Sequence, residues 1–518
     1  MKRYSFLMAA AMLAVIGCEK SPEEINSSAE GNVYMQFSVK MLTTKSSTDV
    51  PGVGDSNSNA DPDIEVGLDK ENKISTVDIA LVKGGKYFVS PNVKPVEATT
   101  DTYVASFNTL ELEENATYKV YIYANCSAPA SFAIDEVSEE KVANMTKDNA
   151  FWMTNAYAAN EVTLKGLASH TTPQNPLNLG SHYVERSMAR FDYMAAKANN
   201  TYDKGAGLSL TLTRAALINQ SKNHYMFRRV VGSDNTTGEP LALTNAVVGG
   251  VELPTSWVVD TDWAKKEAAN FDAQLSNPNS WTWTDLSSLT ANDNYSVGDY
   301  KIWCYAKENT LPGIKAQKHE VSTGVVFEAE ITAGAGASQT VKEAMATGNR
   351  IYVFSDTLYG TWADVKTAAL GNRSYPTLRA AYNQAIAGQT QEQVNSAVEP
   401  TAKNAADAGF TGYSAVKDNN NINHYYTYYY YWNRHNDNER PYEMGIMEFA
   451  VVRNNVYKLA VESISRFGHP TPPTDPTNPT DPDPDPVDPD DPDESVNYYF
   501  NVTVKVLPWT VRINNIEF

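Results

Sequence analysis

SVNYYFNVTVKVLPWTVRINNIEF, residues 495–518, forms the C-terminal end of the chain and predicts a β-strand that needs a partner sheet. The apolar residues of its first half stand at every second position: Phe500, Val502, Val504 and Val506. This alternation is the period of a half-buried strand. A lone strand leaves its backbone N–H and C=O groups unpaired, so it must join the edge of a sheet.

The apolar pattern changes phase at Leu507–Pro508. Beyond the proline the apolar residues are odd-numbered: Trp509, Val511 and Ile513. Proline cannot donate a ladder hydrogen bond, so a bulge or kink is expected at this point. Such a kink lets one segment serve two sheets or turn the corner of a sandwich.

A long tether precedes this strand. Residues 468–494 read GHPTPPTDPTNPTDPDPDPVDPDDPDE, with almost no apolar side chain to bury and many like charges. Such a composition predicts an extended spacer, which at roughly 3.1 Å per residue reaches several tens of ångströms. The Asp residues could instead attract Ca²⁺, but proline after most of them opposes the shaped loop that Ca²⁺ requires. The tether lets the strand reach a sheet of another molecule, which is the logic of strand donation between subunits.

The N-terminus predicts export and lipid attachment. A basic start is followed by the apolar run Phe6–Ile16, which is too short to cross a bilayer. Val15-Ile16-Gly17-Cys18 resembles a bacterial lipobox, which predicts a signal peptide over residues 1–17 and lipidation of Cys18. The alternative is an ordinary secretion signal with an incidental cysteine. No later stretch is long and apolar enough for a membrane helix, so we expect any membrane attachment to be through lipid, at the outer membrane.

A second separable strand lies near the start of the mature chain, in a leader over residues 18–45. Its apolar face consists of Val33, Met35, Phe37, Val39 and Met41. The polar, Gly/Ser/Asp-rich stretch 42–67 follows and contains the basic site TTKSSTD around Lys45. A strand joined to its domain by such a segment is a candidate for removal by proteolysis.

Composition favours a secreted, β-rich protein. The formal net charge is −20, which opposes binding to nucleic acid or to an anionic membrane. Hydrophobic residues make up 42%, enough for a sizeable core, and Tyr, Thr and Val are abundant. Cys126 and Cys304 lie far apart in the sequence, so we expect buried thiols rather than a disulfide.

We predict two domains after the leader, with a boundary at the Gly/Asn/Asp cluster 199–207. The first spans residues 46–205 and the second 206–467, followed by the tether 468–494 and the strand 495–518. Residues 361–408 have the spacing of short helices and predict a helical insertion in the second domain. Helical spacing is also present over 135–145, and Asn454-Asn455 predicts a hairpin turn between strands at 447–452 and 456–464.

No motif of catalysis or cofactor binding is present, so neither an enzyme nor a cofactor is expected. His424 and His435 flank the aromatic run 425–432 without the Cys or acidic residues of a metal set. That run has two interpretations, a sugar- or host-binding face or a strand whose side chains pack on both faces. We expect Glu185, Arg186 and Arg190 to form surface or interface ion pairs of little individual strength.

Several segments, in this order, resemble a known family. They are the lipobox at Cys18, Phe151–Asn155, VERSMARF at 184–191, YWNRHND at 431–437, MEFAVVRNNVY at 447–457, and Pro508-Trp509. The chain is similar to the fimbrillins of the type V pili of Bacteroidetes, most of all to the major subunit of the short, or minor, fimbria.

The resemblance implies two transthyretin-like β-sandwich domains and export as a lipoprotein. It also implies that a surface protease removes the leader strand, here the one carrying Val33, Met35, Phe37 and Val39. The C-terminal strand of a neighbour then fills the open groove. The cut would follow Lys45 and leave Ser46 as the new N-terminus, with Lys40 as second choice. No arginine stands between Arg3 and Arg186, so a Lys-cutting protease is implied.

The implied partners are further copies of the chain, accessory tip and anchor subunits, the surface protease and an adhesion ligand. The implied roles are those of a fimbrial stalk subunit in adhesion and biofilm formation. Two alternatives remain open. The chain could be a monomeric surface lipoprotein, acting as an adhesin or glycan-binding module, whose last strand folds back on its own domain. It could also be a tip or anchor subunit of the same pilus.

Overall fold

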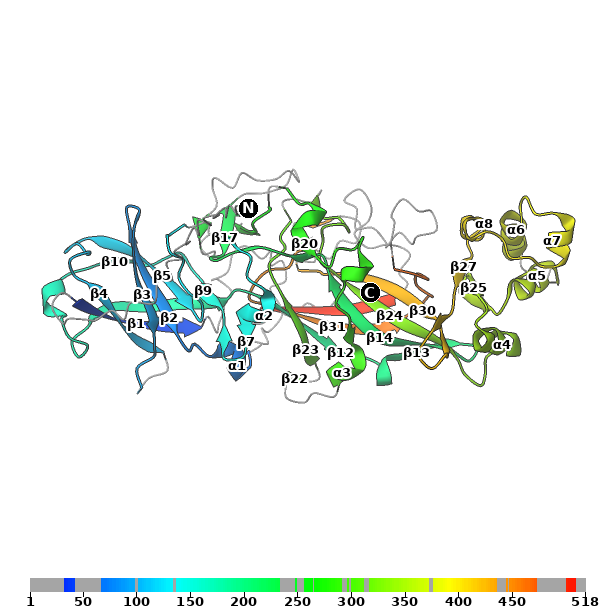
Figure 1. Cartoon of the computed structure of the whole chain (residues 1–518), viewed down its shortest axis with the longest axis horizontal. Helices are drawn as coiled ribbons and strands as arrows, with labels where there is room; N and C mark the ends of the chain where they lie inside the picture. The colour runs from blue at the N-terminus through cyan, green and yellow to red at the C-terminus, as the bar shows by residue number, and fades with distance from the viewer. Residues whose placement is uncertain are drawn as a thin grey trace, which may run out of the picture.

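The computed structural model shows an elongated, mainly β molecule (Figure 1). One β-rich body lies at one end, a second lies in the middle, and a group of helices forms the other end. The structure describes residues 32–41, 67–97, 101–133, 137–232, 247–248, 256–263, 265–290, 296–297, 300–311, 316–371, 376–435, 444–445, 447–472 and 500–508. Cys18, Lys45, Ser46, Trp509 and Val511 therefore lie outside the described residues.

The first body is built on one sheet with the strand order β3-β2-β5-β9-β11-β1-β4, and β10 pairs with β5. Its strands are β1 Asn32–Met41, β2 Val77–Lys83, β3 Lys86–Val93, β4 Thr102–Asn108, β5 Thr117–Ala124, β9 Met153–Asn155, β10 Glu161–Thr163 and β11 Leu177–Arg186. The expected leader strand is thus present as β1. It lies inside the sheet, between β11 and β4, and alternate side chains of these strands form one buried core.

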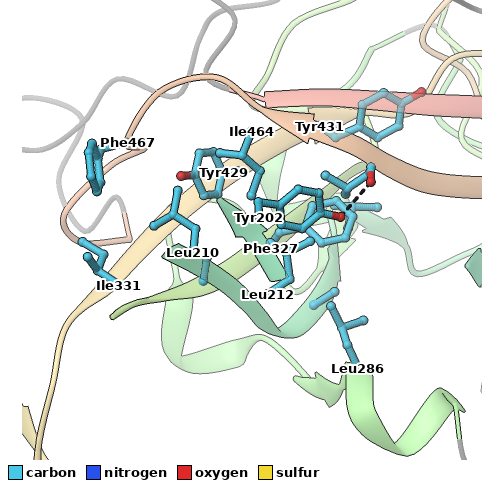
Figure 2. Close-up of a cluster of buried hydrophobic side chains, with 14 of the residues drawn as sticks. Tyr202, Leu210, Leu212, Leu286, Phe327, Ile331, Tyr429, Tyr431, Ile464 and Phe467 are labelled. Carbon is cyan, nitrogen blue, oxygen red and sulfur yellow. Dashed lines mark hydrogen bonds between the residues drawn. The ribbon is translucent and has the colours of Figure 1, made fainter. Parts of the chain in front are cut away.

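The second body contains two main sheets, ordered β22-β23-β12-β31-β32 and β13-β14-β24-β30, with β21 paired to β14. Their bounds are β12 Ala189–Met194, β13 Thr201–Gly205, β14 Leu208–Ile218, β21 Thr284–Asp285, β22 Ser296–Val297, β23 Tyr300–Ala306, β24 Gly324–Ala333, β30 Tyr426–Trp432, β31 Asn455–Ile464 and β32 Phe500–Pro508. Their apolar side chains meet in a core that Figure 2 shows in part. There the Tyr202 hydroxyl donates to the Val461 carbonyl at 2.7 Å.

The two cores lie on opposite faces of the strands that join the bodies. β11 leads almost directly into β12, and Val184 of β11 belongs to the first core whereas Ala189 of β12 belongs to the second. In β31, Val456 belongs to the first core and its neighbour Tyr457 to the second. Because successive residues of a strand point to opposite faces, the buried face changes at this junction.

The predicted helical insertion is confirmed and lies beyond β24. It contains α4 Gln339–Thr347, α5 Trp362–Gly371, α6 Pro376–Ala385, α7 Gln391–Asn395 and α8 Ala402–Asp407, with β25 Ile351–Phe354, β26 Thr357–Tyr359 and β27 Thr411–Tyr413. Trp362 and Tyr382 stack in its own small core. Side chains of Ser338, Thr390 and Thr401 cap helix N-termini, as their residue types favour.

Two predictions of local structure were wrong. The segment before β31 is a turn, and Val451 forms an isolated bridge with Asn309, so no hairpin forms around Asn454-Asn455. Instead β31 pairs with β12 and β32, because a sheet partner is available on each side. Within 137–145, the described part of the expected helix, only α2 is helical; it spans Val142–Met145.

The remaining elements are short. They are α1 Asp69–Asn72, β6 Val137–Ser138, β7 Thr146–Lys147, β8 Ala150–Phe151, η1 Leu167–Ser169, η2 Ala198–Asn200, β15 Gln220–Ser221, β16 His224–Tyr225, β17 Arg229–Gly232, β18 Val247–Val248, β19 Ser256–Val259, η4 Ala268–Asn270, β20 Phe271–Asp272, η5 Pro278–Ser280, α3 Leu286–Thr290, β28 Val416–Lys417 and β29 Asn423–His424. Among the described residues no helix is long and apolar enough to cross a membrane. Cys126 and Cys304 are free, as expected, and burial raises the pKa of both thiols.

Candidate strand-exchange site

β1 lies in a slot between β11 and β4, and it pairs with the backbone of both strands. It runs parallel to β11, with Met41 opposite Val184, and antiparallel to β4, with Ser38 opposite Thr102. Beyond the end of β4, the Val39 N–H still donates to the Asp101 carbonyl at 2.8 Å. Loss of β1 would therefore leave two strand edges unpaired inside one sheet.

The inward side chains of β1 are part of the core. Val33, Met35, Phe37 and Val39 are at most 2% exposed. The Phe37 ring stacks on Tyr103 at a centroid distance of 5.5 Å and meets the His182 ring at 6.3 Å. Burial of such side chains is worth about 1.5–3 kcal/mol each, so removal of β1 would expose an apolar groove.

His182 of β11 was missed by the sequence analysis and lies in the wall of this slot. It is 1% exposed, its Nδ1 lies 3.3 Å from the Asn160 amide nitrogen, and β1 covers it through Phe37. Burial lowers the pKa of His182 to about 4, because the charged ring would lose its hydration. The imidazole is therefore neutral in the closed slot at neutral pH.

The closed first body should lose stability in acid. The pKa of His182 is lower in the folded than in the unfolded chain, so the unfolded state takes up the proton first. Stability is then complete above the unfolded pKa of about 6.5 and falls towards pH 4, by at most about 1.4 kcal/mol per pH unit. We expect His182→Gln to flatten this dependence, measured as urea unfolding at pH 7.5 and 5.0. An equal loss of stability in both proteins would contradict the assignment to His182.

The predicted C-terminal strand is present as β32, and in this single chain it pairs with its own second body. It is antiparallel to β31 at the edge of the sheet, from Phe500 opposite Ile464 to Pro508 opposite Asn455. Val506, Val504 and Val502 are the register partners of residues in the second core, namely Tyr457, Leu459 and Val461. The structure thus brings β1 and β32 to different bodies of the same chain.

The charged residues of the VERSMARF segment are buried between the bodies, which agrees with the interface and not the surface placement that the sequence left open. Arg190 is 0% exposed and contacts Glu71 and Asp192, each at 2.9 Å or less. Glu185 pairs with Arg228, and Arg186 bonds to Asn72 and Asn454. The partners come from distant positions in the sequence, which is why the segment alone did not reveal the network.

The aromatic run 425–432 is packed on both faces. Tyr429 and Tyr431 belong to the main core of the second body, whereas Tyr428 and Trp432 belong to a cluster on the other side of the sheet. This arrangement agrees with the structural interpretation. His435 Nδ1 lies 2.9 Å from the Tyr457 hydroxyl, and among the described residues no group of His, Cys, Asp and Glu could hold a metal ion.

Residues 423–515 match the sequence model of the family described as "Major fimbrial subunit protein type IV, Fimbrillin, C-terminal". No curated protein sequence matches the chain. Similar solved structures include a fimbrilin of Porphyromonas gingivalis, which is 14% identical in sequence. The superposition covers 94% of this chain and 100% of that one, with a TM-score of 0.39.

A putative cell adhesion protein of Parabacteroides distasonis is 11% identical over 93% of this chain and 98% of that one, with a TM-score of 0.39. The tip fimbrial protein Mfa3 of P. gingivalis is 9% identical over 92% and 100%, with a TM-score of 0.31. The C-terminal region of the chain is therefore similar to the C-terminal region of the fimbrillins.

Proposed function

We propose that this chain is a fimbrial stalk subunit that polymerises by exchanging its leader strand for the C-terminal strand of a neighbour. The match of residues 423–515 to the fimbrillin model supports a fimbrial, cell-surface and structural role. In the finer proposal, Cys18 is lipidated, the precursor is held at the outer membrane by lipid, and a surface protease cuts after Lys45. Val33, Met35, Phe37 and Val39 then leave the groove. Accessory tip and anchor subunits complete a fimbria that serves adhesion and biofilm formation.

The observation that carries the proposal is a mismatch between the tether and the position of β32. Phe500 is the register partner of Ile464, which lies only a few residues before the tether begins at Gly468. An antiparallel pair with such neighbouring ends needs a loop of about two to five residues. The long Pro/Asp tether is unnecessary for pairing within one chain, whereas it suits a strand that leaves for another molecule.

The slot around β1 supports the same proposal. β1 contributes four buried side chains to the first core, yet it is joined to the rest of the body through residues 42–66. Its length of ten residues is close to the nine of β32, and both strands alternate apolar and polar residues. One strand can therefore replace the other at small cost in burial, once proteolysis has cut the connection.

Cleavage after Lys45 is the first step to test. Lys40 lies within β1, opposite Tyr183 in the ladder, so it is protected by pairing while Lys45 follows the strand. We expect a Lys-specific protease to release a chain that begins at Ser46, identified by N-terminal sequencing. Lys45→Gln should remain uncut there and should not polymerise. Polymerisation of Lys45→Gln with β1 still attached would contradict the proposal.

The alternative function is that of a monomeric surface lipoprotein with adhesin or glycan-binding activity. The observation in its favour is that β32 pairs with β31 of the same chain. It predicts that the cut chain stays monomeric. A tip or anchor subunit would accept a neighbour's strand without forming a long ladder on its own.

A further inference from the structure

Resting on the proposed strand exchange, we propose that the incoming strand runs in the direction of β1, with Phe500 at the position of Val33 and Val506 at that of Val39. The donor is a second copy of this chain. It would then enter the first body at the Asn32 end of the slot and lie parallel to β11 and antiparallel to β4.

The alternation of apolar residues determines which side chains of the donor face the core. It does not determine in which direction the donor strand runs along the slot. In the direction of β1, Phe500, Val502, Val504 and Val506 take the positions of Val33, Met35, Phe37 and Val39 in that order. In the opposite direction the same four residues fill the same positions in reverse. Another observation must decide between them.

The change of buried face at the junction decides the direction. β1 ends at Met41, opposite Val184, and the buried face changes between Val184 and Ala189. A donor that runs with β1 places Pro508 at Met41, so Trp509 and the odd-numbered apolar residues follow at the junction. The phase of its apolar residues thus changes where the cores change face.

If the donor ran opposite to β1, the apolar residues after Pro508 would not be buried. Trp509, Val511 and Ile513 would then emerge past Asn32 at the free end of the first body. Three large apolar side chains would leave the core for solvent, at a loss of about 1.5–3 kcal/mol each relative to burial. Pro508 itself does not discriminate, since it falls outside the β1–β4 pairing in both cases.

The position of the tether at one end of the molecule and a cavity at the other agree with entry of the donor strand at Asn32. The tether begins beyond Ile464, at the end of β31 remote from the first body, where His469 pairs with Tyr428. At the Asn32 end of the slot lies a cavity of about 660 Å³, lined among others by Leu112, Glu114 and Leu167. The residues that precede Phe500 in the donor therefore have room to enter, and subunits joined in this way follow one another head to tail.

Four pairs of engineered cysteines test the direction. In β1, Tyr34 is the partner of Ser106 and Ser38 is the partner of Thr102 on β4. The proposal places Asn501 and Lys505 of the donor at these two positions. Each full-length chain carries one donor substitution, Asn501→Cys or Lys505→Cys, and one acceptor substitution, Ser106→Cys or Thr102→Cys. All four sites are polar, and both acceptor positions are at least partly exposed, so folding should be retained.

Each variant is cut with the Lys-specific protease, oxidised and boiled in SDS before electrophoresis. We expect a dithiothreitol-sensitive ladder for Asn501→Cys with Ser106→Cys and for Lys505→Cys with Thr102→Cys, and none for the crossed pairs. Uncut chains should give no ladder, because β1 still fills the acceptor slot between β11 and β4. Covalent ladders from the crossed pairs alone would overturn the direction while leaving strand exchange intact. The absence of any ladder before boiling would overturn both.

Discussion

Deletion of residues 495–518 should abolish polymerisation of the cut chain. The donor would lose its four alternating apolar residues, each worth about 1.5–3 kcal/mol when buried, together with all of its ladder hydrogen bonds. Because these contacts form the proposed joint between subunits, nothing then offsets the cost of association. The measurement is SDS-PAGE without boiling, in which the cut full-length chain gives a heat-labile ladder and the deletion gives only monomer.

A matched control keeps the length of the chain and changes only the buried face. In the proposed complex, Val502 and Val504 face into the acceptor groove, so replacing both with Asp buries two charges. Asn501 and Thr503 face outward, so the double variant Asn501→Asp, Thr503→Asp carries the same charges on the exposed face. We expect the first variant to remain monomeric and the second to form the ladder. A ladder from the deletion itself would show that subunits associate through another surface.

Arg190→Ala should destabilise the folded chain by about 3–5 kcal/mol. The Arg190 guanidinium binds Glu71 at 2.9 Å and Asp192 at 2.8 Å, and all three side chains are 0% exposed. Glu71 also accepts a hydrogen bond from the Tyr305 hydroxyl at 2.7 Å. Removal of the cation leaves two carboxylates buried without their partner, which is far more costly than the loss of an exposed ion pair.

The control for Arg190 is an ion pair on the surface. Lys403 and Asp407 of α8 are 2.8 Å apart and about half exposed, so Lys403→Ala should change stability by no more than about 0.5 kcal/mol. Urea unfolding followed by tryptophan fluorescence measures both variants at pH 7.5. Equal and small effects would show that the network between the bodies does not hold them together.

Much of the fold could be predicted because alternation and helical spacing are local signals. The strand with the five apolar residues of β1 and the helices α5 and α6 within residues 361–408 appeared where their patterns placed them. Prediction failed where a distant partner decides the structure. Asn454-Asn455 has the composition of a hairpin turn, but β31 finds β12 and β32 instead.

The candidate site was predicted only in part, for the same reason. The parity of Val33 to Val39 identified which side chains of β1 are buried. No local pattern indicated that His182 and Tyr103 line the slot, since they come from β11 and β4. The phase change at Pro508 suggested a strand that serves two sheets, but the change of core between Val456 and Tyr457 could be seen only in the structure.

A groove opened in one subunit should bind the C-terminal strand of another, and this is tested directly by mixing one variant that has only the groove with one that has only the donor strand. One chain is cut and lacks residues 495–518, so it has a groove and no donor. The other is Lys45→Gln and uncut, so it has a donor and its own β1 in place. Size-exclusion chromatography with light scattering should show a 1:1 complex and nothing larger, with each protein monomeric alone. If both proteins remain monomeric after mixing, strand exchange between subunits is contradicted.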